Sequence, residues 1–216
     1  MMELTIERLI QEAELFSQLI SNKNHPSLLG ITDGKAVGTY VEHLFQKYLN
    51  GKYILEIGSS AAGIDLPSVN TDIKTTSYMQ PQSSCPFQSA RQKIFGLGYN
   101  LLVFVYKKQD VENGCILNII RCTFISSNRT ADYTTTALLR KMLSVGANKE
   151  DIVALLNDKN VPGDEIIHNA LADEILQNPP EQGYLTISNA LQWRLQYKRV
   201  IELNNTVGGV RNFVWQ

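Results

Sequence analysis

The chain has 216 residues, of which 44% are hydrophobic, an ordinary content for one sizeable globular domain with or without a helical extension. Twenty Lys and Arg residues against 21 Asp and Glu residues give a formal net charge of −1, so overall charge offers no argument for binding a polyanion. The longest apolar run, residues 101–106, is too short to span a bilayer, and no basic leader segment is evident. We therefore expect a cytoplasmic protein whose cysteines, Cys85, Cys115 and Cys122, are free thiols.

The first part of the chain predicts two amphipathic helices followed by short strands. Apolar residues recur at helical spacing over residues 6–20, behind the capping residue Thr5, and again over residues 35–49. The spacing then becomes that of strands, with one strand at residues 53–57 and a β-hairpin whose arms are residues 64–67 and 69–75.

The second part predicts a loop, a strand pair and a helical region. Residues 78–87 are polar and contain proline, which favours a loop, and a helix is expected over residues 89–97. Residues 101–106 and 116–125 predict buried strands. Three helices are expected at residues 133–145, 149–156 and 164–176. Residues 188–203 predict a last helix capped by Ser188, although their aromatic and β-branched content leaves a strand open, and Gly208-Gly209 predicts a turn.

Together these elements predict an α/β (α+β) fold with a mixed sheet flanked by helices. We expect a core with the N-terminal helices at residues 1–130 and a helical C-terminal region at residues 131–216, packed as one compact unit.

Two carboxylates and a lysine gather in the predicted hairpin. Residues two apart on a strand share a face, so Asp72 and Lys74 project together, and the tight turn brings Asp65 beside Asp72. Oxygen ligands in this arrangement suit Mg²⁺, which keeps several waters and binds substrate phosphate. A carboxylate-held metal can polarise an attacking water, and Lys74 can orient that water or stabilise the transition state, so the pattern indicates phosphodiester hydrolysis.

This segment resembles the PD-(D/E)xK nuclease superfamily, and the run Thr71-Asp72-Ile73-Lys74-Thr75-Thr76 is especially similar to type II restriction endonucleases. Asp65 matches the first acidic position of the family, Asp72 the second and Lys74 the lysine. The resemblance spans about residues 37–106 and implies a restriction-endonuclease-like core.

The resemblance also implies roles for neighbouring residues. Glu42, on the helix before the hairpin, matches a helical Glu that serves as an additional catalytic residue, and Asp65, Asp72 and Ile73 are the implied Mg²⁺ ligands. Glu56 is the alternative candidate for the first acid.

The acid-x-Lys triplet is not specific by itself, because Asp33-Gly34-Lys35 has the same form. That triplet lies in a glycine-containing loop before a helix and predicts a helix cap. The alternative for Asp65, Asp72 and Lys74 is an exposed hairpin with a surface salt bridge, a contact that stabilises by less than about 1 kcal/mol.

Several polar residues are candidates for binding DNA: Gln88, Arg91, Gln92, Lys93, Arg194 and Lys198. For the first four, an ordinary polar helix face is the alternative. Residues 149–176 have the outline of a helix-turn-helix, but their second helix is acidic, which favours packing or dimerisation over contact with phosphates.

We expect a Mg²⁺-dependent type II restriction endonuclease that cuts a short palindromic site in double-stranded DNA. Symmetric cleavage predicts a homodimer, and protection of host DNA predicts a cognate DNA methyltransferase. The alternatives are a repair, recombination or mobile-element nuclease of the same superfamily, and a non-catalytic DNA-binding module that retains the fold.

Overall fold

The computed structural model describes residues 2–55, 63–86, 88–188 and 192–215. The chain forms two compact units and passes between them four times: unit 1 comprises residues 1–82, 99–125 and 201–216, and unit 2 comprises residues 83–98 and 126–200. The expected boundary at residue 130 lies close to the passage after Ile125, but the units are interleaved along the chain. The division at residue 130 stays a prediction.

Unit 1 is built on a mixed four-stranded sheet in the order β3-β5-β6-β9. Its strands are β3 (Thr71–Ser77), β5 (Asn100–Val111), β6 (Gly114–Ile125) and β9 (Val210–Val214). β3 pairs with β5 in parallel, whereas β5 with β6 and β6 with β9 are antiparallel. The expected mixed α+β fold with a sheet flanked by helices is confirmed.

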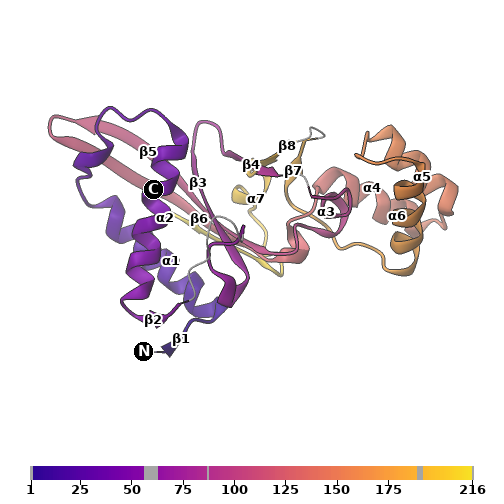
Figure 1. Cartoon of the computed structure of the whole chain (residues 1–216), viewed down its shortest axis with the longest axis horizontal. Helices are drawn as coiled ribbons and strands as arrows, with labels where there is room; N and C mark the ends of the chain where they lie inside the picture. The colour runs from indigo at the N-terminus through magenta and orange to yellow at the C-terminus, as the bar shows by residue number, and fades with distance from the viewer. Residues whose placement is uncertain (1, 56–62, 87, 189–191, 216) are drawn as a thin grey trace. The chain divides into compact units, whose positions relative to one another are not determined.

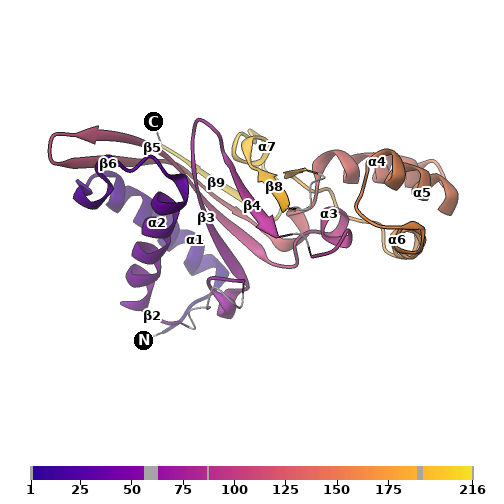
Figure 2. The same ribbon diagram turned by 45° about the horizontal axis from the view of Figure 1, so that its top comes forward.

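Two helices cover one face of this sheet. α1 (Ile6–Ser21) and α2 (Gly34–Asn50) lie side by side on it (Figures 1 and 2), and they begin at the capping side chains of Thr5 and Asp33. Their apolar stripes pack with alternate sheet residues into one core. The members of that core from α1, α2 and β5 include Phe16, Phe45 and Phe104, whose rings meet at centroid separations of 4.9 to 5.8 Å.

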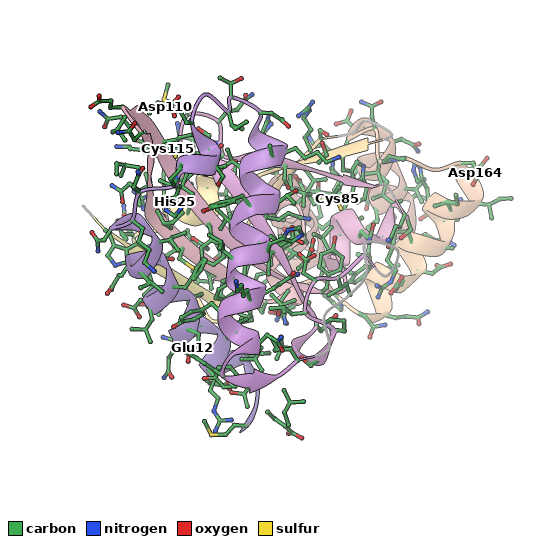
Figure 3. The ribbon with its side chains drawn as sticks, turned by 60° about the vertical axis from the view of Figure 1, so that its left-hand side comes forward. Glu12, His25, Cys85, Asp110, Cys115 and Asp164 are labelled. Atoms are coloured by element: carbon green, nitrogen blue, oxygen red, sulfur yellow. The ribbon has the colours of Figure 1, made fainter. Side chains whose placement is uncertain are left out.

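The β5–β6 hairpin is long, and its turn is exposed where Figure 3 labels Asp110. His25 and Cys115 exchange main-chain hydrogen bonds at the start of β6, which joins the segment after α1 to the hairpin. All three cysteines are buried, and none of them forms a disulfide bond, as expected. A small parallel pair, β1 (Met2–Glu3) with β2 (Tyr53–Ile54), completes the unit.

Unit 2 combines a helical group with a small sheet. Its helices are α3 (Arg91–Phe95), α4 (Tyr133–Ser144), α5 (Lys149–Asp158) and α6 (Glu165–Gln177), and α6 starts at the capping residue Asp164, labelled in Figure 3. The sheet has the order β4-β8-β7, with β4 (Gln82–Pro86), β7 (Thr186–Ile187) and β8 (Gln192–Gln196), and the short helix α7 (Lys198–Ile201) follows. Among the described residues, no helix is long and apolar enough to cross a membrane.

Two predicted elements differ from the structure, and one strand was not predicted. Residues 192–203 do not form the expected last helix but contain the strand that the sequence left open: Trp193 and Leu195 are buried with strand spacing in β8, Tyr197 is buried directly after it, and only α7 is helical. Residues 82–86 are a strand, not a loop, because β8 supplies their pairing partner. The segment after Gly209 is also a strand, β9, paired with β6.

Candidate active site

The predicted hairpin is a tight turn that enters β3. Leu66 and Thr71 exchange both main-chain hydrogen bonds, at 3.0 and 3.1 Å, as a single β-bridge. Between them a 3-10 turn covers Pro67–Val69, and Asn70 takes the left-handed conformation with φ 46°. On the other side of this bridge the N–H of Ile73 is bonded to the side chain of Asp65 and not to a main-chain carbonyl, so the first arm of the hairpin is shorter than expected.

This turn holds Asp65 against β3. The main-chain N–H of Ile73 donates to Oδ2 of Asp65 at 2.7 Å. Ile73 belongs to the core beneath α1 and α2, so Asp72 and Lys74, one residue on either side of it, share the opposite face of the strand. Lys74 Nζ lies 2.7 Å from Asp72 Oδ2, and the Asp72 side chain is only 6% exposed.

Glu42 on α2 joins the same group of charges. Burial and the negative charge of Asp65 raise the pKa of Glu42, against opposing effects of His43 and Lys74. Burial raises the pKa of Asp72 to about 7; Lys74 opposes the rise, and hydrogen bonding to Asp65 adds to it. The structure thus brings together Glu42, Asp65, Asp72 and Lys74, with more negative charge than one lysine offsets.

Asn100, the first residue of β5, holds the turn by two hydrogen bonds. The sequence analysis did not identify it as a site residue. Its main-chain N–H donates to Asn70 O at 2.8 Å, and its side-chain amide donates to Val69 O at 3.1 Å. The Asn100 side chain is 7% exposed, so these bonds form away from water. The one sign of Asn100 in the sequence is that this polar residue directly precedes the apolar run 101–106.

Two other acids of the sequence analysis lie outside this group. Asp33 is the N-cap of α2, where its carboxylate accepts from the N–H groups of Lys35 and Ala36, so its interpretation as a cap is confirmed. Glu56, the alternative for the first acid, lies outside the described residues.

The first four candidate DNA contacts belong to the α3 region of unit 2. Lys93 is 3% exposed, and its Nζ donates to Ile187 O at 3.0 Å; burial lowers its pKa, although Asp132 opposes this. Gln92 is 8% exposed and donates to Leu97 O. Burial of these two side chains does not suit contact with phosphates. Arg91 pairs with Glu174, and Gln88 is exposed and bonded to Gln92.

Arg194 and Lys198, the other two candidates, are exposed. A cavity of about 350 Å³ between α5 and α6, lined by residues such as Lys149 and Glu165, contains none of the candidate site residues. Its lining offers no group that the sequence analysis assigned to chemistry.

The mixed α+β fold and the acid, acid and lysine group are consistent with a nuclease-like enzyme. A family model described as "Type II restriction enzyme NspV" matches residues 3–212. The type II restriction enzyme NspV of Nostoc sp. (strain ATCC 29411 / PCC 7524) is 54% identical over 209 residues, which cover 96% of this chain and 95% of that protein. No solved structure matches the chain. The chain belongs to the NspV family of type II restriction enzymes, so it is a site-specific endonuclease.

Proposed function

We propose that the protein cuts double-stranded DNA at a short specific site in a Mg²⁺-dependent reaction, with Asp65, Asp72, Lys74 and Glu42 as a PD-(D/E)xK-type catalytic centre. The observation that carries the proposal is the convergence of these four side chains, from one turn, one edge strand and the adjacent helix. A surface salt bridge, the alternative for the hairpin, does not account for an Asp72 side chain that is 6% exposed.

The residues present fit Mg²⁺. Among the described residues, no three His, Cys, Asp or Glu side chains form a metal site by themselves. Mg²⁺ does not require such a set, because it is commonly held by one or two carboxylates while it keeps several waters. Asp65 and Asp72 supply the carboxylates, and Ile73, between Asp72 and Lys74, supplies a main-chain carbonyl. Burial first, and then the neighbouring carboxyl group of Asp65, raise the pKa values of Asp72 and Glu42, and a bound cation would favour their ionised forms.

The bound metal would supply a Lewis acid that activates water and neutralises charge at the phosphate. Asp72 holds the Lys74 ammonium group at 2.7 Å, which positions a hydrogen-bond donor where an attacking water can be oriented. The N–H group of Ile73 fixes the Asp65 carboxylate, so this acid needs little reorganisation before the reaction. Glu42 adds a carboxylate that can accept a proton from the water network.

The proposal extends to the assembly and its surroundings. Cutting both strands of a palindromic site needs two centres related by a two-fold axis, so we propose a homodimer. Host DNA must be protected from such an enzyme, so we propose a cognate DNA methyltransferase and a cytoplasmic location. Family membership favours this function over a repair, recombination or mobile-element nuclease and over a non-catalytic module.

The central test is cleavage of plasmid DNA with and without Mg²⁺ by the wild type and by Asp72→Ala. We expect discrete fragments with uniform ends from the wild type with Mg²⁺ only, and loss of cutting by at least about 100-fold in Asp72→Ala, because removing transition-state stabilisation of this kind costs several kcal/mol. Binding of the same DNA by Asp72→Ala should remain measurable.

Asp33→Ala is the matched control, because it removes the acid of the other acid-x-Lys triplet. This variant should lose about 1 kcal/mol of stability as a helix cap is lost, while it still cuts. Wild-type cutting by Asp72→Ala, or cutting without any divalent metal, would reject the proposed centre.

A further inference from the structure

Strand β8 of unit 2 divides its side chains between a buried face and an exposed face. Trp193 and Leu195 of β8, and Tyr197 directly after it, are fully buried, whereas Arg194 and Gln196 are exposed. Three large buried anchors hold the backbone of the strand in place, so the two exposed side chains start from a rigid support.

The neighbouring strand β7 extends the exposed row. Thr186, also exposed, is the register partner of Gln196, and directly opposite residues of an antiparallel pair project from the same face. Ser188 stands opposite Arg194, since its N–H donates to Arg194 O and its Oγ accepts from Arg194 N. We call Thr186, Ser188, Arg194 and Gln196 the β7–β8 face.

The charge around this face suits a polyanion. Residues 182–201 contain Arg194, Lys198 and Arg199 and no Asp or Glu. Arg194, Lys198 and Arg199 are all exposed, and the guanidinium group of Arg199 also lies over the Tyr133 ring, 3.9 Å from its centroid. The helices α5 and α6 of the same unit carry the opposite balance, with the acids Glu150, Asp151, Asp158, Glu165, Asp173 and Glu174. Duplex DNA would be attracted to the β7–β8 face and repelled by those helices.

The side chains of the β7–β8 face favour contacts with bases over contacts with phosphates alone. A surface that only holds phosphates needs cations, whereas the β7–β8 face places neutral donors and acceptors beside a single arginine. Arg forms bidentate hydrogen bonds with O6 and N7 of guanine, and Gln forms bidentate hydrogen bonds with N6 and N7 of adenine. β8 lies between β4 and β7, and DNA-binding proteins that read bases with a ribbon or a sheet place strands in the major or the minor groove.

We propose that the β7–β8 face reads base edges of the recognition site in the major groove, with Arg194 contacting a guanine and Gln196 an adenine. Lys198, just beyond β8, binds the phosphate backbone. This inference rests on the proposed function, because it concerns how the same nuclease chooses its site.

The test compares full-length wild type with Arg194→Ala, Arg194→Lys, Gln196→Ala and Lys198→Ala. The site is first mapped by sequencing fragment ends, and kcat/KM is then measured on duplexes with each base pair replaced in turn. Arg194→Ala and Gln196→Ala should each cut the mapped site about 10- to 100-fold more slowly and lose preference at a single base pair, a G·C pair for Arg194 and an A·T pair for Gln196. Lys198→Ala should weaken binding equally on all duplexes and reduce the salt dependence.

Two variants serve as controls. Gln177→Ala removes an exposed glutamine of α6 and should leave every rate unchanged. Arg194→Lys keeps the positive charge but loses the planar fork, so it should not restore the G·C preference. If Arg194→Ala unfolds, as judged by thermal melting, Arg194→Lys alone decides the role of Arg194.

Unchanged base preference in Gln196→Ala and Arg194→Lys would overturn the inference, and wild-type preference in Arg194→Lys would assign Arg194 to phosphate. Failure of the proposed catalytic centre is distinguishable, because it concerns cutting by Asp72→Ala and not the choice of site.

Discussion

At the scale of single residues, the candidate centre depends on a few polar groups that fix a turn. The candidate catalytic carboxylate Asp65 is not on a strand, and its side chain is fixed against β3 by one main-chain hydrogen bond from Ile73. The turn that precedes β3 is held by Asn100 of the neighbouring strand β5. A catalytic centre requires its side chains to be positioned within about 0.5 Å. A residue that does not touch the substrate can therefore control the rate of cleavage.

We predict that Asn100→Ala lowers kcat by about 10-fold or more with little change in the KM for DNA, because Asp65 loses its fixed position while the DNA-binding surface stays intact. Val69 O also loses one of its two donors, while Thr71 Oγ1 still donates to it at 2.8 Å, so the loss of stability should be about 1 kcal/mol. Single-turnover kinetics and thermal melting measure the two effects.

Tyr53→Phe is a control for the Asn100 experiment, since it also removes a hydrogen bond in the interior of unit 1, to Glu12 at 2.8 Å. It should lower stability without lowering kcat. An equal drop of kcat in both variants would show that Asn100 acts only through stability.

Glu12, labelled in Figure 3, makes stability depend on pH. Burial alone would raise its pKa, but hydrogen bonds from Lys52, Tyr48 and Tyr53 lower the pKa below its ordinary value of 4.5. A carboxylate with a lowered pKa stabilises the fold above pH 4.5, and this contribution is lost as the pH falls through the lowered pKa.

We therefore predict that Glu12→Gln is less stable than wild type by about 1 to 3 kcal/mol at pH 7 and that the gap closes below pH 4.5. Urea unfolding at a series of pH values measures it. A gap that stays constant down to pH 3 would mean that the ionised carboxylate contributes nothing.

At the scale of elements, five of the helices and the strands β3, β5 and β6 were predictable, whereas β4, β8 and β9 were not. α1, α2, α4, α5 and α6 have periodic apolar faces and side-chain caps, which are local signals. β4 and β9 have no comparable pattern, because their pairing partners are more than 80 residues away in the sequence. For β8 a helix was preferred and a strand left open, because five residues are too few to distinguish helical from strand spacing of apolar side chains.

The residues of the candidate site also differ in how far the sequence alone predicted them. Asp65, Asp72 and Lys74 are close in sequence, and their strand spacing predicted a shared face. The clamp by Asn100 and the burial of Lys93 depend on segments that meet only in the folded chain, so the sequence carried no direct sign of them.

The connection after α3 gives a prediction at this scale. Gly96 ends α3 with φ 91°, and a Cβ atom there would lie 2.2 Å from Ser127 O. Gly98 has a similar φ of 89°, but a Cβ atom there would meet nothing within 4 Å. We predict that Gly98→Ala lowers the free energy of unfolding by about 1 to 2 kcal/mol, because alanine is strained at a positive φ. Gly96→Ala should lower it clearly more, because its Cβ atom would also meet Ser127 O. Chemical unfolding compares the two, and equal costs would contradict the close approach of Ser127.

At the scale of the whole molecule, neither unit is a continuous piece of chain. The sheet of unit 1, which carries Asp72 and Lys74, is completed by β9, more than 80 residues after β6. Beyond the main-chain ladder, Thr123 Oγ1 donates to Asn212 Oδ1 at 2.6 Å across this pair.

We predict that a chain ending at Thr206, which lacks β9, loses cleavage and cooperative melting, because β6 is left with an unpaired edge. Adding a peptide of residues 205–216 should restore part of the activity. Wild-type cutting by the shortened chain would show that β9 is dispensable.

The late position of β9 also has a consequence during synthesis. A ribosome must make more than 200 residues before β9 can pair with β6, so this edge of the sheet that carries Asp72 and Lys74 is unpaired until synthesis is nearly complete. When the last residues emerge, two chains on neighbouring ribosomes can exchange them, each β9 pairing with the β6 of the other. Such an exchange would join two copies without requiring any surface beyond the one that closes a single chain.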